Sequence, residues 1–215
     1  MKIALIGATG FVGSALLAEA LERGHDVIAL TRDASKLHAH PKLQPAIADV
    51  YDPAQVAAAV AGADVVLSAF NPGWGKADIR ALFVQGHDAI VAGSKAAGVA
   101  RLVEIGGAGS LYVAPGVQLL DTPDFPAEWK EGAEGARDAL RRLQGEAGLD
   151  WTFVSPPVFL APGARSGRYR TGGDEVLFDG DKPAGISSAD LAVAVLDEIE
   201  APKHSRRRFT AASAA

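Results

Sequence analysis

The chain has 215 residues, a net charge of −5 and a 48% hydrophobic fraction, which describes a globular protein able to bury one substantial core. It carries no cysteine, so disulfides, thiolate metal sites and cysteine nucleophiles are excluded, and its acidic balance provides no field that would gather nucleic-acid phosphates. No apolar run is long enough for a membrane span and no signal-peptide pattern is present, so we predict a cytoplasmic protein with no membrane and no nucleic-acid partner.

Short apolar runs alternate with alanine-rich segments of helical period. Because strands buried on both faces have this composition, the pattern predicts an α/β fold of the doubly wound Rossmann type, with a mostly parallel sheet and helices on both faces. The predicted strands are Lys2 to Ile6, Asp26 to Leu30, Leu43 to Ala48, Asp64 to Ala69, Leu102 to Gly106 and Trp151 to Ser155. The predicted helices lie at about 11–23, 53–61, 77–98 and 127–147, and the last has Trp129, Ala133, Ala136, Leu140 and Leu143 on one face.

The pattern changes after residue 156. A loop rich in proline and glycine leads to short segments around Gly167 to Thr171 and Val176 to Phe178, and a helix is predicted from about Ser188 to Glu200. The tail RRRFTAA predicts a last strand, whose arginines 206–208 we interpret as a solvated edge that discourages pairing between sheets, rather than as an anion site. We predict one domain over residues 1–215, with residues 156–215 as a small elaboration on the substrate side.

Three glycines follow the first predicted strand in the stretch GATGFVG. Gly7, Gly10 and Gly13 stand three residues apart at the start of a predicted helix. The first glycine permits a tight turn, the second lets the backbone approach a pyrophosphate, and the third lets the helix lie close to the strand. The phosphates then meet the free N–H groups at the helix start. The sequence therefore predicts a dinucleotide site, which also includes Thr9, Phe11 and Val12.

The residues after the second strand bear on which dinucleotide is bound. An acidic residue there would bind the ribose hydroxyls of NAD, whereas this chain has Arg32, with Lys36 one turn later. A guanidinium can form a charge-assisted pair with a 2′-phosphate, so we predict a preference for NADP(H) over NAD(H). In the competing interpretation Asp33 binds the ribose or caps a short helix, and Arg32 lies in solvent.

Two further strand ends contribute candidate cofactor contacts. Asp49 and Val50 follow the third strand and can reach the adenine, although Asp49 is equally explained as the carboxylate that ends a strand before the next helix. Ala69, Phe70 and Asn71 follow the fourth strand, at the carboxyl edge where open α/β sheets bind ligands. We expect these three residues to flank the inner ribose.

The chain resembles the short-chain dehydrogenase/reductase superfamily, in which GATGFVG is a usual form of the glycine loop. The stretches IGGAGSL, DTPDFP, DWTFVSPPVFLAPG and ISSADLAVAVLDEIE, in this order, resemble the atypical group assigned as NAD(P)H-flavin reductases, related to biliverdin/flavin reductase and to NmrA-like regulators. The resemblance covers nearly the whole chain. It implies bound NAD(P)H and hydride transfer to a flavin-like or quinone-like acceptor. Pro156, Pro157 and Val158 after the sixth strand match the loop that lies near the nicotinamide in this family, although a proline pair fits a rigid loop without a binding role equally well. We also predict cofactor contacts from Gly106 and Gly107 after the fifth strand.

The chain departs from that superfamily in its catalytic residues. Typical members carry a Ser or Thr after the fifth strand and a Tyr-x-x-x-Lys on the next helix, where the lysine lowers the pKa of the tyrosine that moves the proton. This chain has Gly106-Gly107-Ala108 after the strand, and Trp129 and Ala133 on the helix. The tyrosine mechanism is therefore predicted to be absent.

Hydride transfer to a conjugated acceptor needs no such proton carrier, because the acceptor spreads the charge and water can supply the proton. Ser110 and Lys130 are the candidates for polar assistance at this step, although surface exposure is the commoner place for a lysine. Aromatic side chains suited to holding a flat ring, or alternatively to core packing, are Phe70, Trp74, Tyr112, Phe125, Trp129 and Phe159.

Isolated histidines predict no metal site, and we interpret His87 as a core histidine with a satisfied hydrogen bond rather than as a general base. The sequence thus favours an NAD(P)H-dependent reductase of a small-molecule acceptor, acting as a monomer or homodimer. Its alternatives are a non-catalytic NADP(H)-binding sensor and an enzyme of the nucleotide-sugar epimerase/dehydratase type. A sensor would need an extra partner surface, for which the chain leaves little room.

Overall fold

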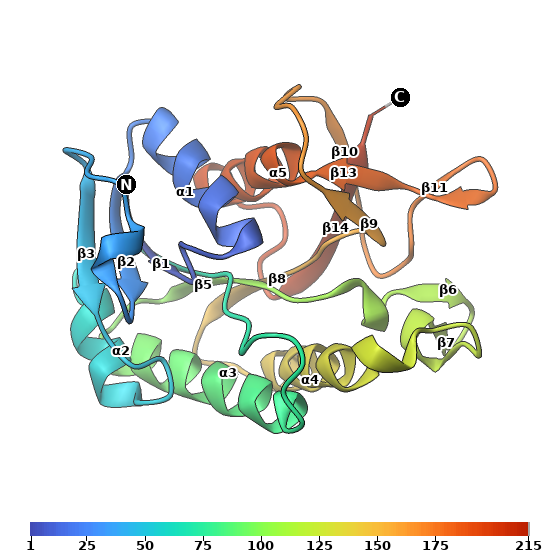
Figure 1. The fold of residues 1–215 in the computed structure, drawn as a ribbon, viewed down its shortest axis with the longest axis horizontal. Helices are drawn as coiled ribbons and strands as arrows, with labels where there is room; N and C mark the ends of the chain where they lie inside the picture. Colours follow the sequence, from blue (N-terminus) through green and yellow to red (C-terminus); the bar gives the residue numbers. More distant parts are fainter. Residues whose placement is uncertain (215) are drawn as a thin grey trace.

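The computed structural model describes residues 1–214 and contains an eight-stranded central sheet (Figure 1). The strand order is β10-β14-β8-β5-β4-β1-β2-β3, and all neighbours are parallel except β10 and β14. The strands of this sheet are β1 (Lys2–Ile6), β2 (Asp26–Thr31), β3 (Leu43–Ile47), β4 (Val65–Ser68), β5 (Arg101–Ile105), β8 (Asp150–Ser155), β10 (Tyr169–Gly172) and β14 (Arg207–Ser213). The predicted doubly wound Rossmann-type fold is confirmed.

Helices cover both faces of the sheet. α1 (Phe11–Glu22) and α5 (Ser188–Glu200) pack together on one face, and α2 (Pro53–Val60), α3 (Ile79–Ala96) and α4 (Ala127–Gln144) form the layer on the other. Each layer has its own apolar core, so the central strands are buried on both sides, as their continuous apolar composition requires.

Short strand pairs and 3-10 turns lie in the connections between the main elements. They are β6 (Tyr112–Ala114) with β7 (Val117–Gln118), β11 (Phe178–Asp179) with β12 (Lys182–Pro183), β9 (Phe159–Ala161) with β13 (Gly185–Ser187), and the 3-10 turns η1 (Ala34–Lys36), η2 (Ala108–Ser110) and η3 (Leu119–Asp121). The chain reverses direction across the sheet between β1 and β4, because β2 and β3 follow on one side of β1 and β4 lies on the other. Ligands of open α/β sheets bind at such a reversal.

The last strand is not the solvated edge predicted from its arginines. β14 lies between β8 and β10, and the short polar strand β10 forms the edge of the sheet instead. Arg208 is buried because its guanidinium donates to the Asp174 carboxylate and to the carbonyl and hydroxyl oxygens of Ser110. Trp129 also departs from its predicted place on the inner face of α4, since it is 53% exposed. Within residues 1–214, none of the helices combines the length and apolarity needed to cross a membrane.

Candidate functional site

The glycine loop forms a backbone cradle between β1 and α1. Gly7 has φ +81°, and a Cβ there would lie 2.5 Å from the Ala69 carbonyl oxygen at the end of β4. A Cβ at Gly13 would lie 1.9 Å from the Gly7 carbonyl oxygen, so a glycine lets α1 approach the turn. Gly10 precedes α1, which has no side-chain cap and no acidic residue in its first turn. The N–H groups of that turn therefore remain available to an anion.

A cavity of about 540 Å³ opens over this cradle at the carboxyl edge of the sheet. It is lined by the residues that follow β1, β2, β3, β4, β5 and β8, and by Leu160 of β9. The residues predicted from the sequence that line it are Gly7, Thr9, Gly10, Phe11, Val12, Arg32, Lys36, Asp49, Val50, Ala69, Phe70, Asn71, Gly106 and Pro156. The structure thus brings six separate strand ends to one cavity.

Gly13, Gly107 and Val158, also predicted as cofactor contacts, do not line the cavity. Gly13 acts through the packing of α1, and Gly107 faces α4, where a Cβ would lie 3.7 Å from that of Ala136. After β8 the chain turns to pair β9 with β13, so Leu160 rather than Val158 faces the cavity. Nothing in the composition of either segment indicates this short pairing.

Two cations and one carboxylate stand after β2 at one end of the cavity. Asp33 caps η1, because its Oδ1 accepts from the Ser35 N–H at 3.0 Å and from the Ser35 hydroxyl at 2.7 Å. These bonds hold the pKa of Asp33 below its usual value. Arg32 and Lys36 line the same end, and neither side chain has a hydrogen bond or ion pair to residues 1–214. The carboxylate is thus engaged, whereas both cations remain available to a ligand.

Tyr51 and Phe70 form an aromatic corner that the sequence prediction included only in part. The ring of Phe70 fills the space that Gly86 leaves on α3, where a Cβ would lie 2.3 Å from the ring. Tyr51 packs edge-on against Phe70 with ring centroids 5.7 Å apart, and burial raises the pKa of its phenol. Tyr51 directly follows Asp49 and Val50, so its position was the signal that could have identified it.

The two predicted polar catalytic residues lie away from the cavity. Ser110 is 2% exposed, and its hydroxyl accepts from Arg208 Nη1 at 2.9 Å. This bond joins η2 to β14. Lys130 is exposed on α4, and neither Ser110 nor Lys130 lines the cavity. Neither residue is therefore placed to assist a reaction in the cavity.

His87 is a core histidine, as predicted. It is 1% exposed on α3, and its Nδ1 lies 2.8 Å from the carboxylate of Glu104 on β5. Burial alone would lower the pKa of His87, but the Glu104 carboxylate outweighs it and the pKa is raised. No group of metal-ligating side chains able to hold an ion occurs among residues 1–214.

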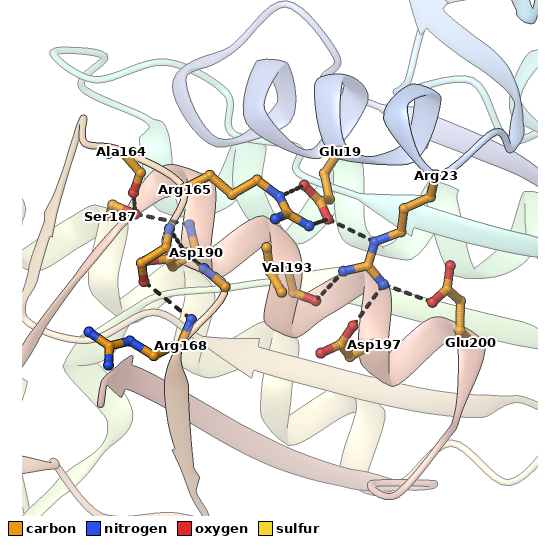
Figure 2. A network of polar contacts seen from close by, with 12 residues as sticks. Glu19, Arg23, Ala164, Arg165, Arg168, Ser187, Asp190, Val193, Asp197 and Glu200 are labelled. Carbon is orange, nitrogen blue, oxygen red and sulfur yellow. Dashed lines mark hydrogen bonds and ion pairs between the residues drawn. The ribbon is translucent and has the colours of Figure 1, made fainter. Parts of the chain in front are cut away.

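The strap, defined as residues 159–168, borders the cavity through Leu160 and is held by two buried carboxylates (Figure 2). Glu19 of α1 accepts from Arg165 Nε and Nη2 at 2.7 and 2.8 Å. Asp190 of α5 accepts from the N–H groups of Ser166 and Gly167, both at 2.8 Å, and from the Ser166 hydroxyl. Burial opposes ionisation of both acids, yet these donors lower the pKa of each. The wall of the cavity formed by the strap is therefore fixed to α1 and α5.

The reversal of strand order, the glycine cradle and the cavity above it define a dinucleotide-binding protein of the Rossmann type. Residues 7–202 match the family model described as NAD(P)H-binding, and the chain belongs to this family. This agrees with the resemblance to atypical short-chain dehydrogenases/reductases.

Similar proteins extend over the whole chain. The "Uncharacterized protein YwnB" of Bacillus subtilis (strain 168) is 39% identical and covers 100% of both chains. A "putative epimerase" from Bacteroides thetaiotaomicron is 42% identical with a TM-score of 0.93, covering 100% of this chain and 97% of that one. A "putative NADH-flavin reductase" from Streptococcus pneumoniae TIGR4 is 32% identical with a TM-score of 0.85, covering 100% of both chains. The two solved structures share the Rossmann-type fold of this chain.

Proposed function

We propose that the protein is an NAD(P)H-dependent reductase of a conjugated small molecule such as a flavin or a quinone. One observation carries the proposal. A single cavity is lined by the glycine cradle, by Arg32 and Lys36 after β2, and by the apolar side chains of Phe70, Trp74 and Leu160. Bound NAD(P)H would supply the hydride, and the acceptor would take a proton from water. The name of the streptococcal structure supports the same class of reaction.

Different residues of the cavity would bind the cofactor and the acceptor. The glycines at positions 7 and 13 let α1 approach the turn after β1, and a pyrophosphate would bind at the N–H groups of the α1 amino terminus. Arg32 and Lys36 line the cavity after β2, where a 2′-phosphate would bind, and their charges support a preference for NADP(H). The apolar side chains of Phe70, Trp74 and Leu160 would orient a flat ring beside the cofactor, and such orientation can supply several kcal/mol without an acid or base.

Proton transfer by a Tyr-x-x-x-Lys pair has no support at the corresponding positions. Ala108 begins η2, and α4 carries Trp129 and Ala133 where the superfamily has tyrosine and lysine. Ala133 packs against η2, since a Cβ at Gly109 would lie 2.9 Å from its methyl group. The space is thus filled by small apolar groups, which argues against alcohol dehydrogenation and against epimerisation through a keto intermediate.

The decisive experiment is NADPH and NADH oxidation followed by absorbance with FMN, riboflavin, menadione and biliverdin as acceptors. The proposal expects turnover with at least one of them, and faster turnover with NADPH at low cofactor concentration. Tight NADPH binding without turnover of any acceptor would contradict it and favour a redox sensor. Conversion of a nucleotide sugar without net NADPH oxidation would favour the epimerase alternative.

A further inference from the structure

A second pocket, of about 350 Å³, is lined by residues of α4, β6, β7, η3 and β14. Figure 1 shows β6 and β7 beside α4. The pocket shares no lining residue with the cavity over the glycine cradle. Three arginines line it, Arg137, Arg141 and Arg208, together with two aspartates, two glutamines, Tyr112 and Gly116. We call it the arginine pocket. All its lining residues except the glycine have polar side chains, so its composition suits a charged ligand rather than an apolar one.

Helix α4 presents a row of hydrogen-bond donors to the arginine pocket. Arg137, Arg141 and Gln144 are spaced four and three residues apart, so their side chains lie on one face of the helix. Two guanidinium groups at this spacing repel each other when no negative charge lies between them. An anion bound in the pocket would replace this repulsion by attraction.

Arg137 is largely buried but only partly hydrogen-bonded. Its side chain is 12% exposed, and its Nη1 donates to both carboxylate oxygens of Asp121 at 2.9 Å and to Gln118 at 3.3 Å. Its Nε is buried without a hydrogen-bond partner in residues 1–214, and Nη2 lies 3.8 Å from the Glu134 carboxylate, too far for a hydrogen bond. Buried donors are normally paired, because an unpaired one costs free energy. Both donors on the Nε–Nη2 edge of the guanidinium thus lack an acceptor within residues 1–214.

The other two arginines contribute differently to the pocket. Arg208 is buried and donates to Asp174 and to η2, so it adds positive charge to a rigid wall. Arg141 is 60% exposed and makes no hydrogen bond within residues 1–214, since the Asp138 carboxylate lies 3.6 Å from its Nη1. Arg141 therefore keeps its donors available to a ligand.

We propose that the arginine pocket binds a small organic carboxylate, held by the Nε–Nη2 edge of Arg137 and by the guanidinium of Arg141. A guanidinium edge and a carboxylate match in geometry and form two parallel charge-assisted hydrogen bonds. Three arginines against two aspartates in the lining favour a ligand with a single negative charge, because the aspartates would repel a phosphate dianion. The Tyr112 hydroxyl, which has no hydrogen bond within residues 1–214, can bind another polar group of the ligand.

The test is a titration of the full chain with sodium acetate at constant ionic strength, followed by the NMR signals of the arginine Nε–H groups. The Arg137 signal is assigned by its loss in Arg137→Gln. We expect this signal to shift saturably, with a Kd on the order of millimolar. Inorganic phosphate should bind more weakly than acetate, and sodium chloride should cause no saturable shift. Saturating NADP⁺ should leave the Kd of acetate unchanged, because the pocket and the cavity share no lining residue.

Two neighbouring arginines of α4 separate binding in the pocket from a general effect of charge. Arg142, like Arg141, is exposed, but it pairs with Asp88 and does not line the pocket. We expect Arg141→Gln to weaken acetate binding about tenfold, because charge-assisted hydrogen bonds are lost, and Arg142→Gln to leave it unchanged.

The contrary outcomes are distinct. Tighter binding of phosphate than of acetate would overturn the assignment of a carboxylate ligand. Equal weakening in the Arg141→Gln and Arg142→Gln variants, displacement of acetate by NADP⁺, or no saturable shift in the parent protein would overturn the site itself. None of these measurements depends on the reductase function proposed above.

Discussion

Arg32 and Asp33 are neighbours in sequence but have opposite environments. The Asp33 carboxylate is used by the cap of η1, whereas the Arg32 guanidinium has no partner within residues 1–214 and faces the cavity. We predict that Arg32→Ala weakens NADPH binding by about tenfold to a hundredfold, because a charge-assisted pair with the 2′-phosphate is lost. NADH binding should change little. Titration of both nucleotides by fluorescence checks this, and equal loss for the two would contradict it.

Gly13 provides a second prediction for a single residue. Gly13→Ala would place a methyl group 1.9 Å from the Gly7 carbonyl oxygen, so α1 must move away from the cradle. We expect lower stability and loss of measurable binding of both NADPH and NADH. Gly62→Ala tests the cost of a positive φ alone, since Gly62 has φ +75° with nothing near its Cβ position and does not line the cavity. Thermal unfolding and nucleotide titration of the two variants separate the effects, and normal binding by Gly13→Ala would refute the role assigned to Gly13.

The glycine loop and the residues after β2 could be predicted from sequence because their chemistry follows from local spacing. Ser110 could not, since its hydroxyl is used by Arg208, which comes nearly a hundred positions later in the chain. The same distant pairing explains why Arg208 is buried although it stands in a run of three arginines. A charge run predicts solvent exposure only where no buried partner exists.

At the scale of elements, the ion pair between Arg165 and Glu19 allows a test of how the strap is anchored beside the cavity. Arg165 donates to Glu19 twice, whereas the side chain of Arg168 on the same strap has no partner within residues 1–214. We predict that Arg165→Ala raises amide hydrogen exchange in residues 159–168 and raises KM for the acceptor, because the wall that includes Leu160 loosens. The loss of global stability should be small, since the Arg165 side chain is 51% exposed and Glu19 still accepts a hydrogen bond from Arg23. The matched variant Arg168→Ala removes the same charge and should change neither exchange nor KM. Equal exchange in both variants would contradict the anchoring role.

Element prediction succeeded for strands that are buried on both faces, and it failed where pairing joins segments that are distant in the sequence. β1, β4, β5 and β8 have continuous apolar runs, and such runs identify strands of a covered sheet. β10 is short and polar, so nothing in its composition predicted that it would displace β14 from the edge. The pairing of β9 with β13 joins segments on either side of a long excursion, and it decides which residue after β8 reaches the cavity.

At the scale of the whole molecule, the topology follows from the order of strands and helices, because parallel crossovers leave few alternatives. The acceptor end of the cavity does not follow in the same way. Its walls come from the loop after β4, the end of β5 and the strand β9, and their alignment depends on the anchoring of the strap. The sequence therefore gives a stronger prediction that a cofactor is bound than it gives for the molecule that receives the hydride.

Buried carboxylates make the stability of the whole chain sensitive to acid. Glu19, Asp190 and Glu198 are each less than 6% exposed, and hydrogen bonds lower the pKa of each against the opposing effect of burial. A lowered pKa in the folded state means that the unfolded state binds more protons in acid. The contribution of these three carboxylates to the free energy of unfolding should therefore be constant above about pH 5 and fall as the pH decreases below about 4.5. Urea unfolding at several pH values checks this, and in Glu198→Gln the fall should be shallower. An equal fall in that variant would refute the contribution of Glu198.

The buried pair of His87 and Glu104 makes the free energy of unfolding depend on pH in the opposite direction. The pKa of His87 is raised in the folded state, so the folded chain keeps a proton on this residue at a pH where the unfolded chain has lost it. The stabilisation from the pair is complete below about pH 6.5 and is lost as the pH rises through the raised value, with a limiting slope of about 1.4 kcal/mol per pH unit. We predict that the free energy of unfolding decreases over this range in the parent protein and stays flatter in His87→Gln. His38→Gln, which changes an exposed histidine, should keep the slope of the parent. If His87→Gln shows the same slope as the parent, the pair is not protonated and the assignment of its charge is wrong.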